Sequence, residues 1–513
     1  MDRWQTKNIV CDGGLNLHTG ILEQGTLYPG SARELINYEP AEDKGYRKLL
    51  GYTKYNEVAV PGDVDAPVTL AQPFKDTVVA VRYSGTSNDI YTSDGTGAWV
   101  KQNSSLRPNN STRARSTVYS ISEEVIVVTD GSNPALKFNG TTDVVLNTAG
   151  APTNPKYGTE HLNRLVLSGY TSNPSAITIS SPNDDEDFNA ANGAIELNVG
   201  DIVVGLASFR NTLYIFCQNS IHKLSGADST TFAVDNVTDR IGCVSGDTIQ
   251  EIAGDLIFLA PDGLRSLAAT DRIGDVELGL QSRPIQQLTR EVIQQNPQSF
   301  SSVAVVSKSQ YRLFYFVSGK DDNSQQGVLG KYKPNERYQY EWATTLGFPV
   351  YSAGYRYLDD NRNLIVFGHP DNGIVYQMES SGGLDGNSLP FSYCSPPLTF
   401  DDTELRKVVY KLETTAKSEA TTSISNNLIL DEYLSEQTIQ PPSDTLIIEG
   451  AGVAFGDGVF GGFVFSESGK AVSTERMIRG SGDTVTIKYS GSNTDAPHTI
   501  ESFTITYAMK GRR

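Results

Sequence analysis

The chain has 513 residues, of which 38% are hydrophobic and 20% charged, and its formal net charge is −18 at pH 7. A chain of this length can bury a large core, and we expect it to form two or three domains. The acidic balance excludes a broad attraction to nucleic acid or anionic lipid, because such binding depends on Lys and Arg displacing counterions. No apolar run approaches the roughly 18 residues that cross a bilayer, and the amino terminus lacks a signal-peptide pattern, so we expect a soluble protein made in the cytoplasm.

Glycine, proline and tyrosine are abundant, with 47, 23 and 25 copies, which is typical of many short strands joined by turns. The four cysteines, Cys11, Cys217, Cys243 and Cys394, form no CxxC pair. Their spacing predicts neither a zinc site nor a disulfide framework, and buried, reduced thiols are the expected state. The pattern as a whole predicts an all-β protein without cofactors.

Strand-like runs recur along the chain, each rich in β-branched or aromatic residues and each ending at Gly, Asn, Asp or Pro. They lie at 77–83, 124–131, 176–182, 212–226, 255–267, 311–319, 363–378 and 484–491. Two of them contain their own turn, at Pro261-Asp262-Gly263 and at Pro370-Asp371-Asn372-Gly373, which predicts hairpins. Hairpins repeated about every 40 to 50 residues indicate the blades of a β-propeller rather than a single sandwich.

One segment, 282–295, has the pattern of a helix inserted between blades. Ser282 is placed to cap it, Pro284 falls in its first turn, and Ile285, Leu288 and Val292 share one face.

The composition of the sequence changes near residue 391. A polar stretch and then the glycine-rich segment 450–463 follow, before further strands. We expect a separate β-rich, sandwich-like module here, in which the glycines serve tight turns or close backbone contacts. The predicted organisation is an N-terminal segment at 1–60 that joins the ring or closes the propeller, a β-propeller at 61–390 and a C-terminal β-rich domain at 391–513.

The segment SDGTGAW at 93–99 resembles the Asp-box turn of sialidase propellers, although it lacks the spacer between Ser and Asp. In those enzymes the box is a structural turn, so the segment favours a propeller and does not indicate catalysis.

An acidic run, Asp184, Asp185, Glu186 and Asp187, is the most concentrated charge in the chain. Calcium needs six to eight oxygens, and an EF-hand supplies them at alternate positions with a glycine, which this run lacks. A solvated loop is the first interpretation, and a loop that lines a channel is the second. The five histidines have no HExxH spacing and the chain has no G-x-S-x-G elbow, so we expect a protein that is not an enzyme.

Three long segments resemble the nozzle, or tail-hub, proteins of short-tailed phages (podophages). They are 15–55, with its Asn37-Tyr38-Glu39 step and its Gly45 to Tyr52 step, then 180–226, and then 241–285. The resemblance continues to the terminal GRR, but it consists of turn glycines and core residues and carries no catalytic residue. It implies a β-propeller subunit of a hexameric ring below the portal's adaptor, in contact with tail fibres or spikes. Genomic DNA would pass through this ring toward the host envelope without specific binding.

Two other functions remain open from the sequence. A receptor- or carbohydrate-binding propeller of a phage tail would need aromatic platforms, and Trp4, Trp99 and Trp342 are few and scattered. A secreted bacterial propeller used for adhesion would need the signal peptide that the amino terminus lacks. The sequence therefore favours a structural virion protein, assembled in the host cytoplasm, with the acidic run at 184–187 as a candidate for the channel wall.

Overall fold

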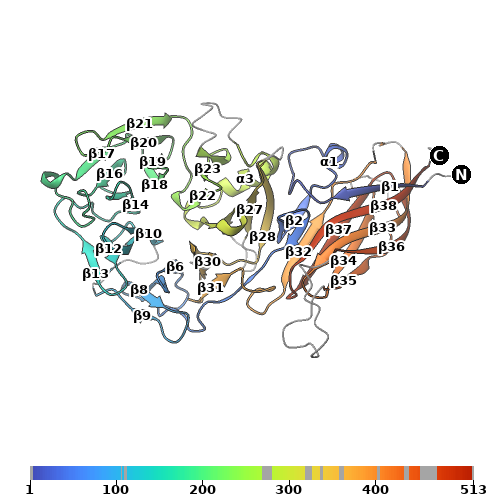
Figure 1. The fold of residues 1–513 in the computed structure, drawn as a ribbon, viewed down its shortest axis with the longest axis horizontal. Helices are drawn as coiled ribbons and strands as arrows, with labels where there is room; N and C mark the ends of the chain where they lie inside the picture. Colours follow the sequence, from blue (N-terminus) through green and yellow to red (C-terminus); the bar gives the residue numbers. More distant parts are fainter. Residues whose placement is uncertain are drawn as a thin grey trace.

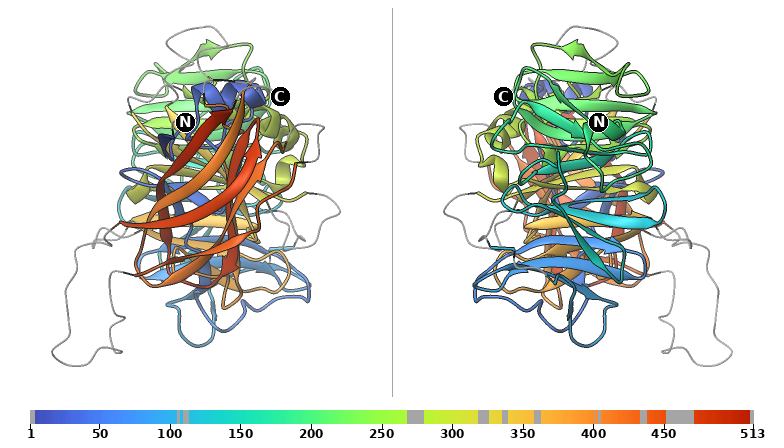
Figure 2. Two further views of the ribbon diagram at one scale, coloured as in Figure 1. Left: turned by 90° about the vertical axis from the view of Figure 1, so that its right-hand side faces the viewer. Right: turned by 90° about the vertical axis from the view of Figure 1, so that its left-hand side faces the viewer.

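The computed structural model describes residues 4–104, 107–108, 113–267, 280–317, 326–334, 339–357, 363–400, 402, 405–432, 438–450 and 471–510. The molecule has two parts, a ring of small sheets and a pair of longer sheets, and both termini lie at the far end of the longer sheets (Figure 1). Figure 2 shows the two ends, with the long C-terminal strands facing the viewer in one view and the small sheets in the other.

The ring consists of seven groups of strands among the described residues, and within each group consecutive strands pair in antiparallel fashion. The first four groups are β6–β9 (Val68–Phe74, Thr77–Tyr83, Asn88–Ser93, Val100–Lys101), β10–β13 (Arg115–Ser120, Glu124–Thr129, Ala135–Phe138, Asp143–Leu146), β14–β17 (Tyr157–Glu160, Leu165–Ser168, Ala176–Ile179, Ile195–Asn198) and β18–β21 (Val203–Phe209, Thr212–Cys217, Ile221–Ser225, Ala233–Thr238). The other three are β22–β24 (Gln250–Ile252, Asp255–Ala260, Gly263–Ser266), β25–β28 (Ser301–Val305, Gln310–Tyr315, Gln326–Tyr332, Tyr340–Leu346) and β29–β31 (Ser352–Tyr357, Asn363–Gly368, Val375–Met378).

The ring closes on itself, because β29 of the last group contacts β6 of the first. The N-terminal strand β5 (Tyr52–Lys54) pairs with β31 and supplies the fourth strand of that last group. Closure of this kind is the arrangement of a β-propeller, in which each blade is covered by two neighbours and few edges stay open.

Burial on both faces explains why the blade strands are almost continuously apolar. In β7, Val79 and Val81 pack against the second blade, whereas Val78 and Ala80 pack against the seventh. Alternate residues of a strand point to opposite faces, so a strand between two neighbours needs apolar residues at every position.

The second part of the molecule is built from two sheets with long strands. One contains β32 (Leu389–Cys394), β34 (Thr422–Leu430), β35 (Asp444–Ile448) and β37 (Val485–Asn493), and the other contains β33 (Arg406–Ser418), β36 (Val472–Gly482) and β38 (His498–Lys510). Leu412 of β33, Ile487 of β37 and Phe503 of β38 belong to one hydrophobic cluster, so the two sheets share a core.

The N-terminal segment ties the two parts together. Its strands β1 (Gln5–Val10), β3 (Tyr38–Pro40) and β4 (Tyr46–Lys48) join the sheet of β33 and β38. Strand β2 (Glu34–Ile36) lies between β28 of the propeller and β32 of the second part, so a single nine-stranded sheet runs from one part into the other. This shared sheet couples the blade of β25–β28 to the C-terminal strands.

The all-β class and the propeller blades are confirmed, and the two predicted hairpins are β23–β24, with Gly263 at φ +143°, and β30–β31, with Gly373 at φ +71°. The glycine-rich segment lies outside the described residues from position 451 onward. The division at residues 60 and 390 stays a prediction.

The predicted helix is shorter than expected. A 3-10 turn at Arg283–Ile285 precedes α3 at Gln286–Ile293, and the apolar face packs into the core as predicted. The predicted cap is wrong, because Ser282 Oγ accepts a hydrogen bond from the backbone N–H of Leu264 instead of from the helix.

A second helix, α1 (Ile21–Leu27), is absent from the prediction. It has no side-chain cap, and Gly25 lies inside it, so the sequence carries weak helix signals there. Gly25 is needed for packing, because a Cβ at this position would lie 1.8 Å from the carbonyl oxygen of Pro397.

Candidate functional site: the central cavity of the propeller

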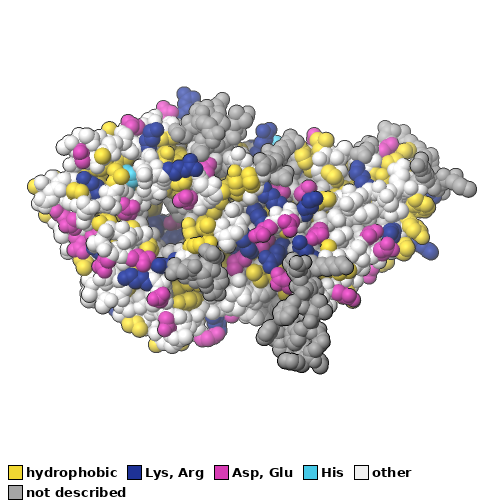
Figure 3. Space-filling view, viewed as in Figure 1, with side chains coloured by type: hydrophobic (Ala, Val, Ile, Leu, Met, Phe, Trp, Pro, Cys, Tyr) yellow, Lys and Arg dark blue, Asp and Glu magenta, His cyan; other side chains and the backbone are white. Residues whose placement is uncertain are grey.

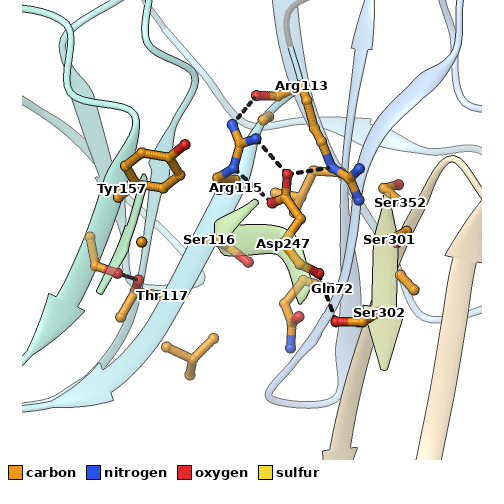
Figure 4. Close-up of a pocket in the computed structure, with 18 of the residues that line it drawn as sticks. Gln72, Arg113, Arg115, Ser116, Thr117, Tyr157, Asp247, Ser301, Ser302 and Ser352 are labelled. Atoms are coloured by element: carbon orange, nitrogen blue, oxygen red, sulfur yellow. Dashed lines mark hydrogen bonds and ion pairs between the residues drawn. The ribbon is translucent and has the colours of Figure 1, made fainter. Parts of the chain in front are cut away.

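The centre of the ring holds a cavity of about 420 Å³, lined by the innermost segment of each of the seven groups. The space-filling view has a hollow at the middle of the ring (Figure 3). Polar and charged side chains from distant parts of the chain meet in this cavity (Figure 4). We treat it as the candidate functional site because it joins concave shape with buried charge.

One ion pair crosses the cavity wall between two blades. Arg115, at the start of β10, donates from Nε to Asp247 Oδ1 at 2.7 Å and from Nη2 to Asp247 Oδ2 at 2.6 Å. Asp247 lies in a 3-10 turn (Gly246–Thr248) just before β22. The pair is a bidentate fork, the geometry in which a guanidinium and a carboxylate bind most strongly.

A second guanidinium, that of Arg113, lies beside this pair. Its Nε is 3.8 Å from Asp247 Oδ2, beyond hydrogen-bond range, and its Nη1 donates to the carbonyl oxygen of Phe300. The side chains of Arg113 and Arg115 are only 8% and 14% exposed. Arg115 also lies over the ring of Tyr157, with 5.1 Å between its Cζ and the ring centroid.

The electrostatics of the cluster follow from burial and from these contacts. Burial opposes the ionisation of Asp247, but the guanidinium groups of Arg113 and Arg115 outweigh it and hold the pKa of Asp247 below its usual value. Burial lowers the pKa of Arg113. It also lowers the pKa of the nearby Lys156, with help from the positive charge of Arg115. Three cationic side chains therefore share one carboxylate.

Hydroxyl and amide groups complete the polar wall. Ser302 Oγ donates to the carbonyl oxygen of Asp247 at 2.6 Å, and Gln250 Nε2 donates to Ser302 Oγ at 3.1 Å. Ser301 is 1% exposed, and its Oγ finds no hydrogen-bond partner among the residues that the structure describes. A buried hydroxyl without a partner is uncommon and calls for an explanation.

The predicted acidic run lies elsewhere, in the loop that follows β16. Asp185 and Glu186 both bind Lys137 of the neighbouring blade, at 2.6 and 2.9 Å from Nζ, and Tyr119 Oη donates to Asp185 at 2.7 Å. Asp185 is 7% exposed, so it is a buried contact between blades and not part of a solvated loop.

The other two acids of the run shape the loop itself. Asp184 Oδ1 accepts the backbone N–H of Glu186 at 3.0 Å, and Asp187 Oδ1 accepts that of Asn189 at 2.8 Å. None of the four acids lines the central cavity. That they line a passage between subunits stays a prediction.

The Asp-box-like segment forms the turn between β8 and β9. Asp94 accepts hydrogen bonds from the backbone N–H and the hydroxyl of Thr96, and the buried Trp99 donates to the carbonyl oxygen of Val58. Its structural role is thus as predicted.

All four cysteines are buried and unpaired, as predicted. Among the described residues, no group of three or more His, Cys, Asp or Glu is placed to hold a metal ion.

The Arg113, Arg115 and Asp247 cluster was missed by sequence analysis. Arg115 and Asp247 are 132 positions apart, and no motif links them. Only the short R-A-R step at 113–115, directly before a strand, hinted at charge near the axis.

Comparisons with known proteins name no family. No protein-family model matches the chain, and no curated protein matches it. Among solved structures, the chain is similar to the crystal structure of BBS1N in complex with ARL6DN (10% identity, TM-score 0.35, 64% of this chain and 96% of that one). It is also similar to Hsv2 of Kluyveromyces lactis (12% identity, TM-score 0.29, 54% and 84%). A third is PorZ of the type-IX secretion system of Porphyromonas gingivalis (9% identity, TM-score 0.40, 77% and 55%). Because these TM-scores are below 0.5, the likenesses carry no argument about function.

No helix among the described residues combines the length and apolar character that a membrane crossing requires.

Proposed function

We propose that the chain is a non-enzymatic structural protein of a short-tailed phage virion, a subunit of the hexameric tail nozzle through which the genome leaves. The observation that carries the proposal is that a single β-sheet runs through both parts of the molecule. The nine-stranded sheet passes from a propeller blade through β2 into the C-terminal strands, which we propose form the sandwich-like module. A wall element that contains pressurised DNA needs this kind of resistance to internal hinge motion.

Further support comes from the way the N-terminal segment is used. The resemblance to nozzle proteins includes Asn37, Tyr38 and Glu39, and each of these is buried at the junction of the two parts. Asn37 Nδ2 donates to the carbonyl oxygens of Leu346 and Pro390, and Glu39 binds Lys308 and Arg312. The three residues that carry this part of the resemblance therefore also join the propeller to the second part of the molecule.

The net charge suits a passage for DNA. Each of the six copies would carry a net charge of −18. Part of this negative charge would face the central passage unless every acidic side chain pointed outward. An acidic wall repels the duplex over a Debye length of about 8 Å at physiological salt, which centres the DNA without holding it. On the face shown in Figure 3, basic side chains are interspersed with acidic ones and form no broad basic surface.

The alternative, a receptor- or carbohydrate-binding propeller, has less support. Stacking on sugars needs exposed aromatic faces, and Trp99 and Trp342 are 6% and 0% exposed. Trp4 is exposed, but its ring pairs with that of Tyr410, with 5.0 Å between the ring centroids, and Tyr410 lies in β33 of the second part and not in a blade.

Electron microscopy of the purified full chain, alone and with the portal adaptor of the same phage, tests the proposal. We expect six-fold rings that bind the adaptor through one face. A chain that stays monomeric with the adaptor present, or that binds duplex DNA tightly in a salt-sensitive way, would contradict the nozzle role.

Substitutions in assembled particles can test whether the acidic run lines the DNA passage. The contacts of the run determine which of its residues to change. Lysine at position 185 would face Lys137 and unfold the contact between blades, so the exposed Asp184 is the position to change. If the loop lines the passage, Asp184→Lys should slow DNA release, most at low salt, and Asp184→Asn should slow it less. Equal release rates in all three proteins would remove this loop from the wall.

A further inference from the structure

A buried lysine meets a side-chain amide where the N-terminal segment joins the C-terminal strands. Lys48, the last residue of β4, is 0% exposed, and its Nζ lies 2.6 Å from Oδ1 of Asn493, the last residue of β37. The two residues are 445 positions apart in the chain. Lys48 Nζ also donates to the backbone carbonyl oxygens of Gly382 and Asp495, each at 2.9 Å. These contacts fix the amine directly against the amide.

We propose that Lys48 and Asn493 form an intramolecular isopeptide bond, which cross-links the N-terminal segment to the C-terminal strands. Lys48 Nζ attacks Cγ of Asn493, so a bond forms between these two atoms, and the bond from Cγ to Nδ2 breaks. Nδ2 leaves as ammonia. One amide replaces another, so no oxidant or reductant is needed. The proposal concerns the chain alone and does not depend on a role in a phage tail.

The attack requires a neutral amine, and the surroundings of Lys48 favour one. Burial lowers the pKa of Lys48 to about 8, although the charge of Asp495 opposes this shift. The acceptors that the described residues offer to Lys48 Nζ are uncharged carbonyl oxygens, which stabilise an ammonium less than a carboxylate would. At pH 7 about one tenth of the side chain is therefore the free amine, which is the nucleophilic form.

A path for a proton leads to the nitrogen that leaves. Asn493 Nδ2 donates to Thr422 Oγ1 at 3.2 Å, and Thr422 Oγ1 donates to Asp495 Oδ2 at 2.7 Å. One hydroxyl therefore connects the amide nitrogen to a carboxylate. The carboxylate of Asp495 takes up the proton that the attacking nitrogen releases and returns it through the hydroxyl of Thr422 to Nδ2. Thr422 touches the leaving atom, whereas Asp495 acts on that atom through Thr422.

The strands hold the two reacting groups together before any bond forms. Lys48 pairs with Tyr38 of β3, and Asn493 pairs with Leu389 of β32, so both backbones are fixed by sheet hydrogen bonds. Fixed proximity removes most of the entropy cost that a reaction between separate molecules would have. After the reaction, β4 could not detach from β37 under load unless a covalent bond broke.

Mass spectrometry of the denatured full chain tests the proposal without any variant. We expect a mass lower than that of the sequence by one ammonia, and a tryptic peptide in which Lys48 is joined to Asn493. Lys407 supplies an internal control, because it is also 0% exposed and its pKa is also lowered by burial. Its Nζ donates to the backbone carbonyl oxygens of Asp402 and Asp483, with no side-chain amide among these acceptors, so the Lys407 peptide should stay unlinked.

A chain with the full sequence mass overturns the proposal. A loss of ammonia that maps to a peptide other than the linked one also overturns it, because an asparagine can lose ammonia by closing on its own backbone. Lys48→Arg keeps a positive charge but removes the nucleophile, so this variant should regain the full mass.

The proton path is tested by two substitutions of one residue. Thr422→Ala should lower the cross-linked fraction of freshly purified protein at least about tenfold, whereas Thr422→Ser keeps the hydroxyl and should retain the cross-link. Asp495→Asn should behave like Thr422→Ala, because it keeps the backbone oxygen that binds Lys48 and removes the carboxylate. Circular dichroism checks that each variant is folded. Equal cross-linking in folded Thr422→Ala and Thr422→Ser would contradict the path through the hydroxyl.

Discussion

Tyr38 and His498 share a hydrogen bond of 2.8 Å between Tyr38 Oη and His498 Nε2, although they are 460 positions apart in the chain. Both side chains are fully buried, and their rings meet edge to face with centroids 5.7 Å apart. The contact joins β3 of the N-terminal segment to β38 at the end of the chain. A neutral imidazole can accept the tyrosine proton at Nε2, whereas a protonated one cannot.

The buried His498 predicts a loss of stability in mild acid. Burial, and then the positive charge of Lys48, lowers the pKa of His498 to about 3, whereas the unfolded chain has its usual value near 6.5. Between these values only the unfolded chain takes up the proton, so the free energy of unfolding falls as the pH falls. The slope is at most about 1.4 kcal/mol per pH unit. His498→Gln, which keeps an acceptor for Tyr38, should reduce the fall between pH 7 and pH 5 in urea unfolding.

His222 offers the matched control for this experiment. Its pKa is also lowered by burial, but it is only partly buried, so His222→Gln should change the pH dependence less than His498→Gln does. An unchanged pH dependence in His498→Gln would show that the imidazole takes up its proton in the folded protein.

Among the described residues that line the central cavity, Asp247 is the one carboxylate beside the arginines, so its removal should be costly. Asp247→Asn keeps the shape of the side chain but leaves Arg115 without its anionic partner. Breaking a buried pair from one side costs on the order of 3–5 kcal/mol, and we expect a loss near the lower end of that range in urea unfolding. Asp94→Asn, at an exposed turn, should cost far less. Equal losses in the two variants would mean that solvent already screens the cavity.

The sequence predicted those parts of the fold that depend on local chemistry. Pro261 and Gly263 encode their hairpin within three residues, and Val78 to Val81 encode a strand that is covered on both faces. Each of these signals is complete within one short segment, so no knowledge of the ring is required to see it.

The remaining features depend on closure of the ring and on the passage between the two parts. Strand β2 has three residues, too few for a periodic pattern, and it is defined by its partners β28 and β32. The cavity cluster likewise arises because the start of β10 and the turn before β22 meet at the axis. The acidic run was visible in the sequence, but Lys137, which makes Asp185 a buried contact, could be found only from the packing of blades.

Asp185 and Asp184, neighbours in the acidic run, should lose very different amounts of stability when their charge is removed. The side chain of Asp185 is 10% exposed, and its carboxylate accepts hydrogen bonds from Lys137 and Tyr119 of the neighbouring blade. Asp185→Asn leaves Lys137 with the half-exposed Glu186 as its remaining carboxylate partner, and we expect a loss of about 1–3 kcal/mol in the free energy of unfolding. Asp184→Asn keeps an oxygen that can accept the backbone N–H of Glu186, so its loss should be much smaller. Urea unfolding of the two variants side by side measures the difference.

The comparison also decides how the acidic run should be used in any test of function. If Asp185→Asn is clearly the less stable variant, the run has a structural pair, Asp185 with Glu186, and Asp184 is a solvent-facing residue beside it. A change in phage infectivity caused by Asp185 would then report on the contact between blades, and only Asp184 could report on repulsion of DNA. Equal stability of the two variants would instead mean that the bond from Lys137 Nζ to Asp185 adds little beyond its bond to Glu186.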